Sequence, residues 1–73
     1  MASYKLTSRD PATGCETVYS VLVHLGPLGV ALQSVHYEAG VWTITMDKDL
    51  PEIQRAHFEN NRTQTVFTKE VAR

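Results

Sequence analysis

Histidine and cysteine are the residues of this 73-residue chain best suited to metal binding or nucleophilic catalysis. The histidines are His24, His36 and His57, at intervals of 12 and 21 positions. Zinc sites in short chains usually contain tight pairs such as Cys-x2-Cys or His-x3-His. The wide intervals favour surface or boundary histidines instead, so we expect no metal site and no cofactor.

The single cysteine, Cys15, would need a nearby base or positive charge to act as a nucleophile. It follows Gly14 in a predicted turn, where Arg9 is the one candidate for activating the thiol. No phosphate-binding glycine pattern and no paired carboxylates accompany it. We therefore expect a protein that is not an enzyme, with a small metal- or thiol-dependent enzyme as the weakest alternative.

Length and composition restrict the class of protein. Seventy-three residues suffice for one small domain, 1–73, which buries only about 60% of its unfolded surface. The hydrophobic fraction is 42% and the net charge is −1, which argues against a basic nucleic-acid surface and against attraction to anionic lipid. No apolar run is long enough for a membrane span or a signal peptide. With one cysteine and no possible internal disulfide, these features predict a cytoplasmic protein that does not bind membranes.

The elements that position these residues begin with a predicted hairpin. Residues 10–14, Asp-Pro-Ala-Thr-Gly, are typical of a turn. Such a turn would join antiparallel strands over residues 4–8 and 15–25, the second of which is rich in β-branched and aromatic side chains. One face of that second strand would hold Tyr19, Val21, Val23 and Leu25, and the other Val18, Ser20, Leu22 and His24.

Further elements follow along the chain. The helical spacing of Leu28, Ala31, Leu32 and Val35 favours a short helix, although residues 27–34 could instead form a strand. A second hairpin is expected from residues 36–38 to 41–46, turning at Ala39-Gly40. A helix should begin at residues 49–52, capped by Asp49. Its expected buried stripe is Leu50, Ile53 and Ala56, and its expected left-handed end is Asn60-Asn61.

The chain should end in an edge strand over residues 64–70, in which Lys69 would discourage pairing with other sheets. The complete order predicts an α+β fold with one antiparallel sheet of four to five strands and one or two short helices on one face. From Glu16 onward the order is βαββαβ, so the leading topology is ferredoxin-like, preceded by an N-terminal hairpin strand. An antiparallel meander with a single helix is the alternative.

A partner-binding face follows from this arrangement. If one sheet face packs under the helices, the other would be uncharged and partly apolar, which is typical of a contact site. Its expected residues are Val18, Leu22, His24, His36 and Val41. The sequence therefore favours a small non-catalytic interaction or regulatory protein that binds another protein, as a single chain or as a homodimer.

Nucleic-acid binding is the main alternative function. Tyr37 and Trp42 could stack on bases, while Arg55 and Arg62 could contact phosphates. The predicted strands around these rings contain no lysine or arginine, however, and Glu52 and Glu59 are interleaved with the arginines. A charge-balanced helix is the simpler interpretation, which makes this alternative the less favoured one.

Overall fold

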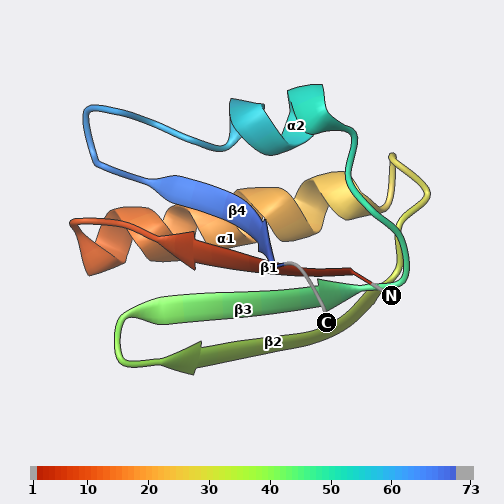
Figure 1. Ribbon diagram of the computed structural model, residues 1–73, viewed down its shortest axis with the longest axis horizontal. Helices are drawn as coiled ribbons and strands as arrows, with labels where there is room; N and C mark the ends of the chain where they lie inside the picture. The colour runs from red at the N-terminus through yellow and green to blue at the C-terminus, as the bar shows by residue number, and fades with distance from the viewer. Residues whose placement is uncertain (1, 71–73) are drawn as a thin grey trace.

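A computed structural model describes residues 2–70, in which strands and helices follow each other in the order βαββαβ (Figure 1). The elements are β1 (Ala2–Thr7), α1 (Pro11–Leu25), β2 (Leu32–Glu38), β3 (Val41–Met46), α2 (Glu52–His57) and β4 (Val66–Glu70).

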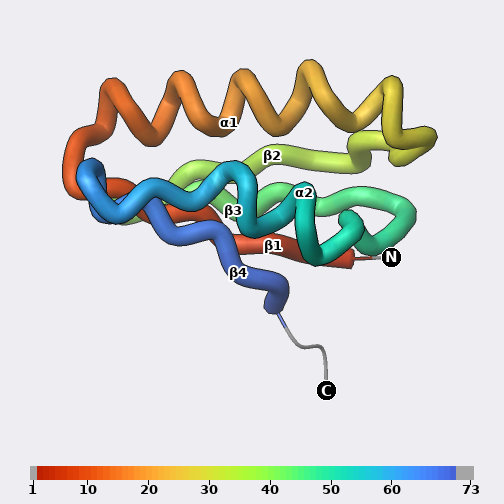
Figure 2. Tube along the Cα trace, turned by 90° about the horizontal axis from the view of Figure 1, so that it is seen from above, coloured from red at the N-terminus to blue at the C-terminus, as the bar shows by residue number. Residues whose placement is uncertain are grey.

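The strands form a single sheet in the order β2-β3-β1-β4, with every neighbouring pair antiparallel. Helix α1 lies across one face of this sheet (Figure 2), and the shorter α2 lies beside β4 (Figure 1). The predicted α+β fold with one antiparallel sheet is confirmed, and the strand order is that of a ferredoxin-like split. The predicted extra N-terminal strand is wrong, because the βαββαβ pattern begins at β1 rather than at Glu16.

The largest correction concerns residues 15–25, which belong to α1 and not to a strand. The side chain of Asp10 accepts hydrogen bonds from the backbone N–H of Ala12 and the hydroxyl of Thr13, so it caps a helix. Pro11 occupies the first turn, where its missing N–H is not needed. The buried residues of α1 recur at helical spacing: Gly14, Val18, Val21 and Leu25.

The helix favoured for residues 27–34 is also corrected, because these residues form no helix. The chain turns after α1, with Gly29 in the left-handed region at φ 74°, and β2 then begins at Leu32. The predicted second hairpin is confirmed: Ala39 and Gly40 have φ values of 51° and 81°, as a two-residue turn of type I′ requires. The predicted final strand is confirmed over Val66–Glu70.

The core lies between α1 and the sheet. Tyr4 stacks on Phe67 with ring centroids 5.1 Å apart, and its buried hydroxyl accepts a hydrogen bond from the Leu50 backbone N–H at 2.9 Å. Gly14 allows α1 to approach Trp42 so closely that a Cβ atom at this glycine would lie 2.5 Å from the indole ring. The buried hydrophobic residues are Ala2, Tyr4, Leu6, Val18, Val21, Leu25, Val30, Ile44, Met46, Leu50, Phe58 and Phe67.

Helix α2 begins near the predicted position but differs in its contacts. Asp49 is not its cap; its carboxylate accepts a hydrogen bond from Lys69 Nζ at 2.6 Å instead. Of the predicted buried stripe only Leu50 is buried, while Ile53 is 84% exposed, because the short α2 lies beside the sheet. The predicted left-handed end at Asn60-Asn61 is also wrong, since the left-handed residue in this loop is Gln64.

Candidate protein-interaction surface

Strand β2 is the most exposed element of the structure. Every residue from 31 to 40 is exposed, although the run contains three large apolar side chains. Leu32, Val35 and Tyr37 are 45%, 40% and 53% exposed, and we call these three residues the β2 surface. They pair with Met46, Ile44 and Trp42 of β3 and so lie on the side of the sheet that faces α1.

The β2 surface is uncovered because α1 lies over the other half of the sheet. In Figure 1, α1 runs behind β1 and β4, whereas β2 lies clear of it. Thr17 lines the cleft between α1 and α2. Tyr19, two residues on, is about 200° further around the helix and so lies on the opposite flank. Its side chain is 70% exposed and adds to the apolar surface of that flank.

Among residues 2–70, no strand pairs with the outer backbone edge of β2. Because a two-residue turn joins β2 to β3, Glu38 and Val41 form the first hydrogen-bonded pair of the ladder. Hydrogen-bonded pairs alternate with non-bonded ones, so the N–H and C=O groups of Val35 and Tyr37 point away from β3. An edge of this kind is a ready template for another strand.

At the opposite edge of the sheet, side chains of α2 and of the residues that follow it cover the backbone of one β4 residue, Phe67. The backbone N–H of Phe67 in β4 donates to Glu59 Oε2 at 3.2 Å, and its C=O accepts from Arg55 Nη1. Arg55 also binds Glu52, with Nε 2.9 Å from Oε1. The hydrogen bond from Arg55 holds the pKa of the Glu52 carboxyl below its ordinary value, and the same contact holds the pKa of Arg55 above its own.

The five residues predicted to share a partner-binding face do not share one. Val18 is buried between α1 and the sheet, and Leu22 is half-buried beside it. His24 is exposed near the end of α1, where its ring packs edge-on against Phe58. His36 and Val41 lie together on the open face of the sheet, turned away from α1. The predicted face is wrong because it depended on a strand over residues 15–25.

The sequence interpretation missed Leu32 and Val35, because it placed both in a helix. Two signals in the sequence pointed to them. Val35 is β-branched and directly precedes the predicted strand of residues 36–38. Residues 17–46 also hold only one formally charged side chain, Glu38, so a strand in this stretch would lack the charges that usually protect a sheet edge.

The candidate nucleic-acid contacts are divided between the two edges of the sheet. Tyr37 and Trp42 lie together, with ring centroids 4.6 Å apart. Arg55 is at the other edge, held by two glutamates and a backbone carbonyl. Arg62 lies in the loop between α2 and β4. The predicted phosphate contacts therefore do not flank the predicted stacking rings.

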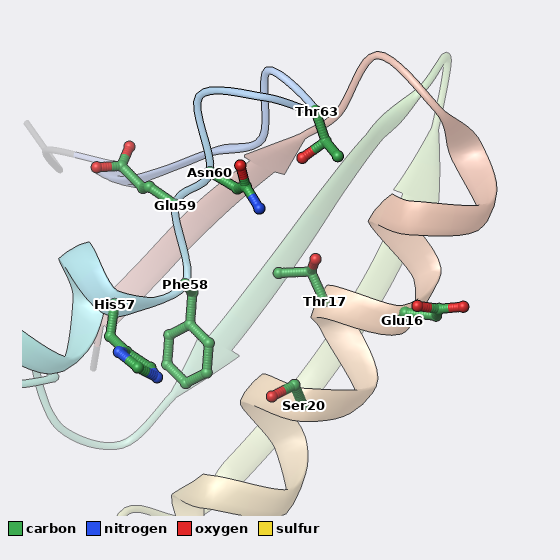
Figure 3. A pocket seen from close by; sticks show the side chains of 8 residues that line it. All are labelled: Glu16, Thr17, Ser20, His57, Phe58, Glu59, Asn60 and Thr63. Atoms are coloured by element: carbon green, nitrogen blue, oxygen red, sulfur yellow. The ribbon is translucent and has the colours of Figure 1, made fainter.

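A polar cleft of about 290 Å³ separates α1 from α2 (Figure 3). Much of its polar lining is already engaged: the Thr17 hydroxyl donates to the Thr13 carbonyl, Asn60 Oδ1 accepts from the Arg62 backbone, and Glu59 binds Arg55. The lining residues are Glu16, Thr17, Ser20, His57, Phe58, Glu59, Asn60 and Thr63. A ligand would have to compete with these internal bonds, so the cleft is a weaker candidate than the β2 surface.

Other features bear on catalysis and location. Within residues 2–70, no three histidine, cysteine or acidic side chains gather as a metal site would require. Cys15 is an exposed free thiol near the start of α1. Neither helix of the described chain is both long and apolar enough to cross a membrane.

Comparisons of the chain with protein-family models, with curated proteins and with solved structures found no significant match. The exposed β2 surface and its free backbone edge are thus the features from which a function can be argued.

Proposed function

We propose that this protein is a small non-catalytic interaction module that binds another polypeptide along β2. The observation that supports this function is the exposure of the whole run 31–40, including the three apolar residues of the β2 surface. Exposed apolar patches on small proteins commonly mark contact sites. A strand with an exposed edge and exposed apolar side chains is also an aggregation risk unless a partner covers it.

The proposed binding mode is the addition of a strand. An extended segment of the partner would hydrogen-bond to the outward N–H and C=O groups of Val35 and Tyr37 and extend the sheet beyond β2. Every second side chain of the added strand would lie on the same side as the β2 surface. Backbone hydrogen bonds would then provide affinity, and the apolar contacts would provide specificity. Such a module regulates its partner by occupying it, and its free thiol suits a reducing compartment such as the cytoplasm.

The test is capture of partners by the tagged protein from its native lysate, with and without nuclease, followed by mass spectrometry. Tyr37→Lys places a charge on the β2 surface, whereas Ile53→Lys places the same charge on the exposed surface of α2. We expect a stoichiometric protein partner that survives nuclease, is lost with Tyr37→Lys and is retained with Ile53→Lys.

Two results would contradict the proposed function. Loss of all bound material after nuclease would transfer the assignment to nucleic-acid binding. Equal recovery by Tyr37→Lys and Ile53→Lys would show that the contact site lies elsewhere. Circular dichroism of both variants checks that each has kept the fold.

A further inference from the structure

We infer that the polypeptide bound by β2 is a second copy of this chain, paired antiparallel through β2 about a two-fold axis. This inference rests on the proposed function and names its partner. An isologous contact of this kind requires one surface that is complementary to itself. The edge, register and charges of β2 each bear on that requirement.

The two edges of the sheet differ in a way that favours pairing at β2 alone. At β4, the outward groups of Phe67 are bonded to Arg55 and Glu59. At β2, the backbone N–H and C=O groups of Val35 and Tyr37 point away from β3, and all of residues 31–40 are exposed. Residues 31–40 also lack lysine, arginine and proline, the residues that usually prevent edge-to-edge pairing.

The hydrogen-bonding pattern selects one register. Pairing Val35 with Val35 of the second copy would bring Tyr37 opposite Gln33, where the ladder with β3 is irregular. Pairing Tyr37 with Tyr37 would bring Val35 opposite Ala39, which lies in the turn at φ 51°. Pairing Val35 with Tyr37 keeps both irregular positions out of its two hydrogen-bonded pairs, because Gln33 and Ala39 then lie opposite each other beyond these pairs. This register is also symmetric. Val35 of the first copy bonds Tyr37 of the second, and Tyr37 of the first bonds Val35 of the second.

The charges of β2 are compatible with this register. The two His36 residues lie opposite each other across the two-fold axis. Glu38 of each copy lies opposite Ser34 of the other, whose hydroxyl can donate to the carboxylate. The two Glu38 side chains are four residues apart along the paired strands, about 13 Å, so their repulsion is weak. Each Glu38 also has its own His36 at 3.6 Å.

The apolar side chains are complementary in the same register. Val35 of each copy lies opposite Tyr37 of the other, a β-branched and aromatic pair of the kind that stabilises antiparallel sheets. The two β2 surfaces then form one continuous apolar floor between the two α1 helices. Tyr19 stands on the flank of each α1 that faces this floor.

The first experiment measures mass by sedimentation equilibrium over a range of protein concentrations. We expect a reversible monomer–dimer equilibrium for the unmodified protein and for Ile53→Lys. We expect Val35→Lys to remain monomeric, because two lysines would meet the apolar floor close to the two-fold axis. A dimer that persists unchanged in Val35→Lys would overturn the inference.

The second experiment tests the register by disulfide formation in a Cys15→Ser background, which removes the native thiol. With His36→Cys, the two thiols would lie opposite each other in a non-hydrogen-bonded pair, where Cβ atoms are close enough for a disulfide. With Ser34→Cys, an equally exposed position on the same face, the thiols would lie about 13 Å apart. Mild oxidation should link His36→Cys chains and leave Ser34→Cys chains single, whereas the reverse result would overturn the register.

The failure of this inference can be distinguished from failure of the proposed function. A chain that is monomeric at every concentration and unlinked at position 36 is not its own partner. If that chain still captures a different protein in a manner that depends on Tyr37, the interaction function stands and only the identity of the partner is overturned.

Discussion

Gly14 is a residue at which α1 packs directly against the sheet. The indole of Trp42 occupies the space that a Cβ atom at Gly14 would need. The glycine is therefore required by packing and not by backbone conformation, since it lies within the helix. Gly26, at the other end of α1, has a right-handed helical conformation, and no atom lies within 4 Å of the position that a Cβ atom would take there.

These two glycines predict opposite effects of the same substitution. Gly14→Ala should lower the free energy of unfolding by about 1–3 kcal/mol, because the indole has to move. Gly26→Ala should raise it by about 0.4–1 kcal/mol, because alanine restricts the unfolded chain without a clash. Urea unfolding followed by Trp42 fluorescence measures both changes. Equal stability of the two variants would contradict the packing of α1 on Trp42.

The Tyr4 hydroxyl is the second residue-scale feature with a measurable consequence. It accepts the backbone N–H of Leu50 inside the core, where water cannot replace it. Tyr4→Phe should therefore destabilise the protein by about 1–3 kcal/mol, the range for an unpaired buried donor. Tyr19→Phe removes a hydroxyl from an exposed ring and should change the stability by less than about 0.5 kcal/mol. Urea midpoints of the two variants give the comparison.

Among the elements, α2 is joined to the sheet by side-chain hydrogen bonds more than by apolar packing. Ile53 is exposed, whereas Arg55 reaches the backbone of β4 and is only 17% exposed at its side chain. Arg55→Met should lower the stability by about 1–2 kcal/mol at neutral pH, the value for a charged hydrogen bond reduced by solvent screening. Unfolding in urea measures this loss, with Ile53→Met as the matched control on the same helix.

The hydrogen bond between Arg55 and Glu52 predicts how the stability of the protein depends on pH. The hydrogen bond from Arg55 lowers the pKa of Glu52 below its ordinary value of 4.5, so the folded protein favours the ionised carboxylate. This contribution to stability is present above pH 4.5 and is lost as the pH falls through the lowered pKa. Arg55→Met should therefore lose less stability than the unmodified protein as the pH falls below 4.5. Parallel slopes for the two proteins would contradict the proposed cause.

Which elements the sequence could predict depended on how local their signals were. The hairpin at Ala39-Gly40 is determined by its turn residues and the alternation beside it, and it was predicted with the correct bounds for β3. Helix α1 was not, because an Asp-Pro step begins turns as well as helices, and its valines favour strands. The close contact of Gly14 with Trp42, which is distant in sequence, is part of the tertiary packing of α1 that no local pattern contains.

The candidate site shows the same dependence on long-range structure. Tyr37 was named from the sequence only as a stacking ring in the nucleic-acid alternative, and it lies in the β2 surface. Leu32 and Val35 were missed because eight residues with mixed spacing fit a helix or a strand equally well. Their exposure depends on where α1 lies over the sheet, a tertiary property that no local pattern contains.

At the scale of the whole molecule, the small size of the domain means that binding a partner would add noticeably to its stability. A domain of 73 residues buries only about 60% of its unfolded surface, which leaves its stability marginal. Association through β2 would stabilise the folded state by mass action. The melting temperature of the unmodified protein should therefore rise with protein concentration, while that of Val35→Lys should stay constant. Calorimetry over a hundredfold concentration range provides the measurement, and a constant melting temperature for both would contradict self-association.

If β2 pairs as inferred, the two side chains that bond Phe67 would also limit how large the assembly can become. A molecule with one free edge joins one other, and the finished pair has nothing left to add to. A molecule with two free edges leaves a new growing end after every addition, which is how open-ended filaments form. In the inferred dimer, Arg55 and Glu59 would therefore oppose further growth of the sheet at Phe67 and would favour a closed particle of two chains.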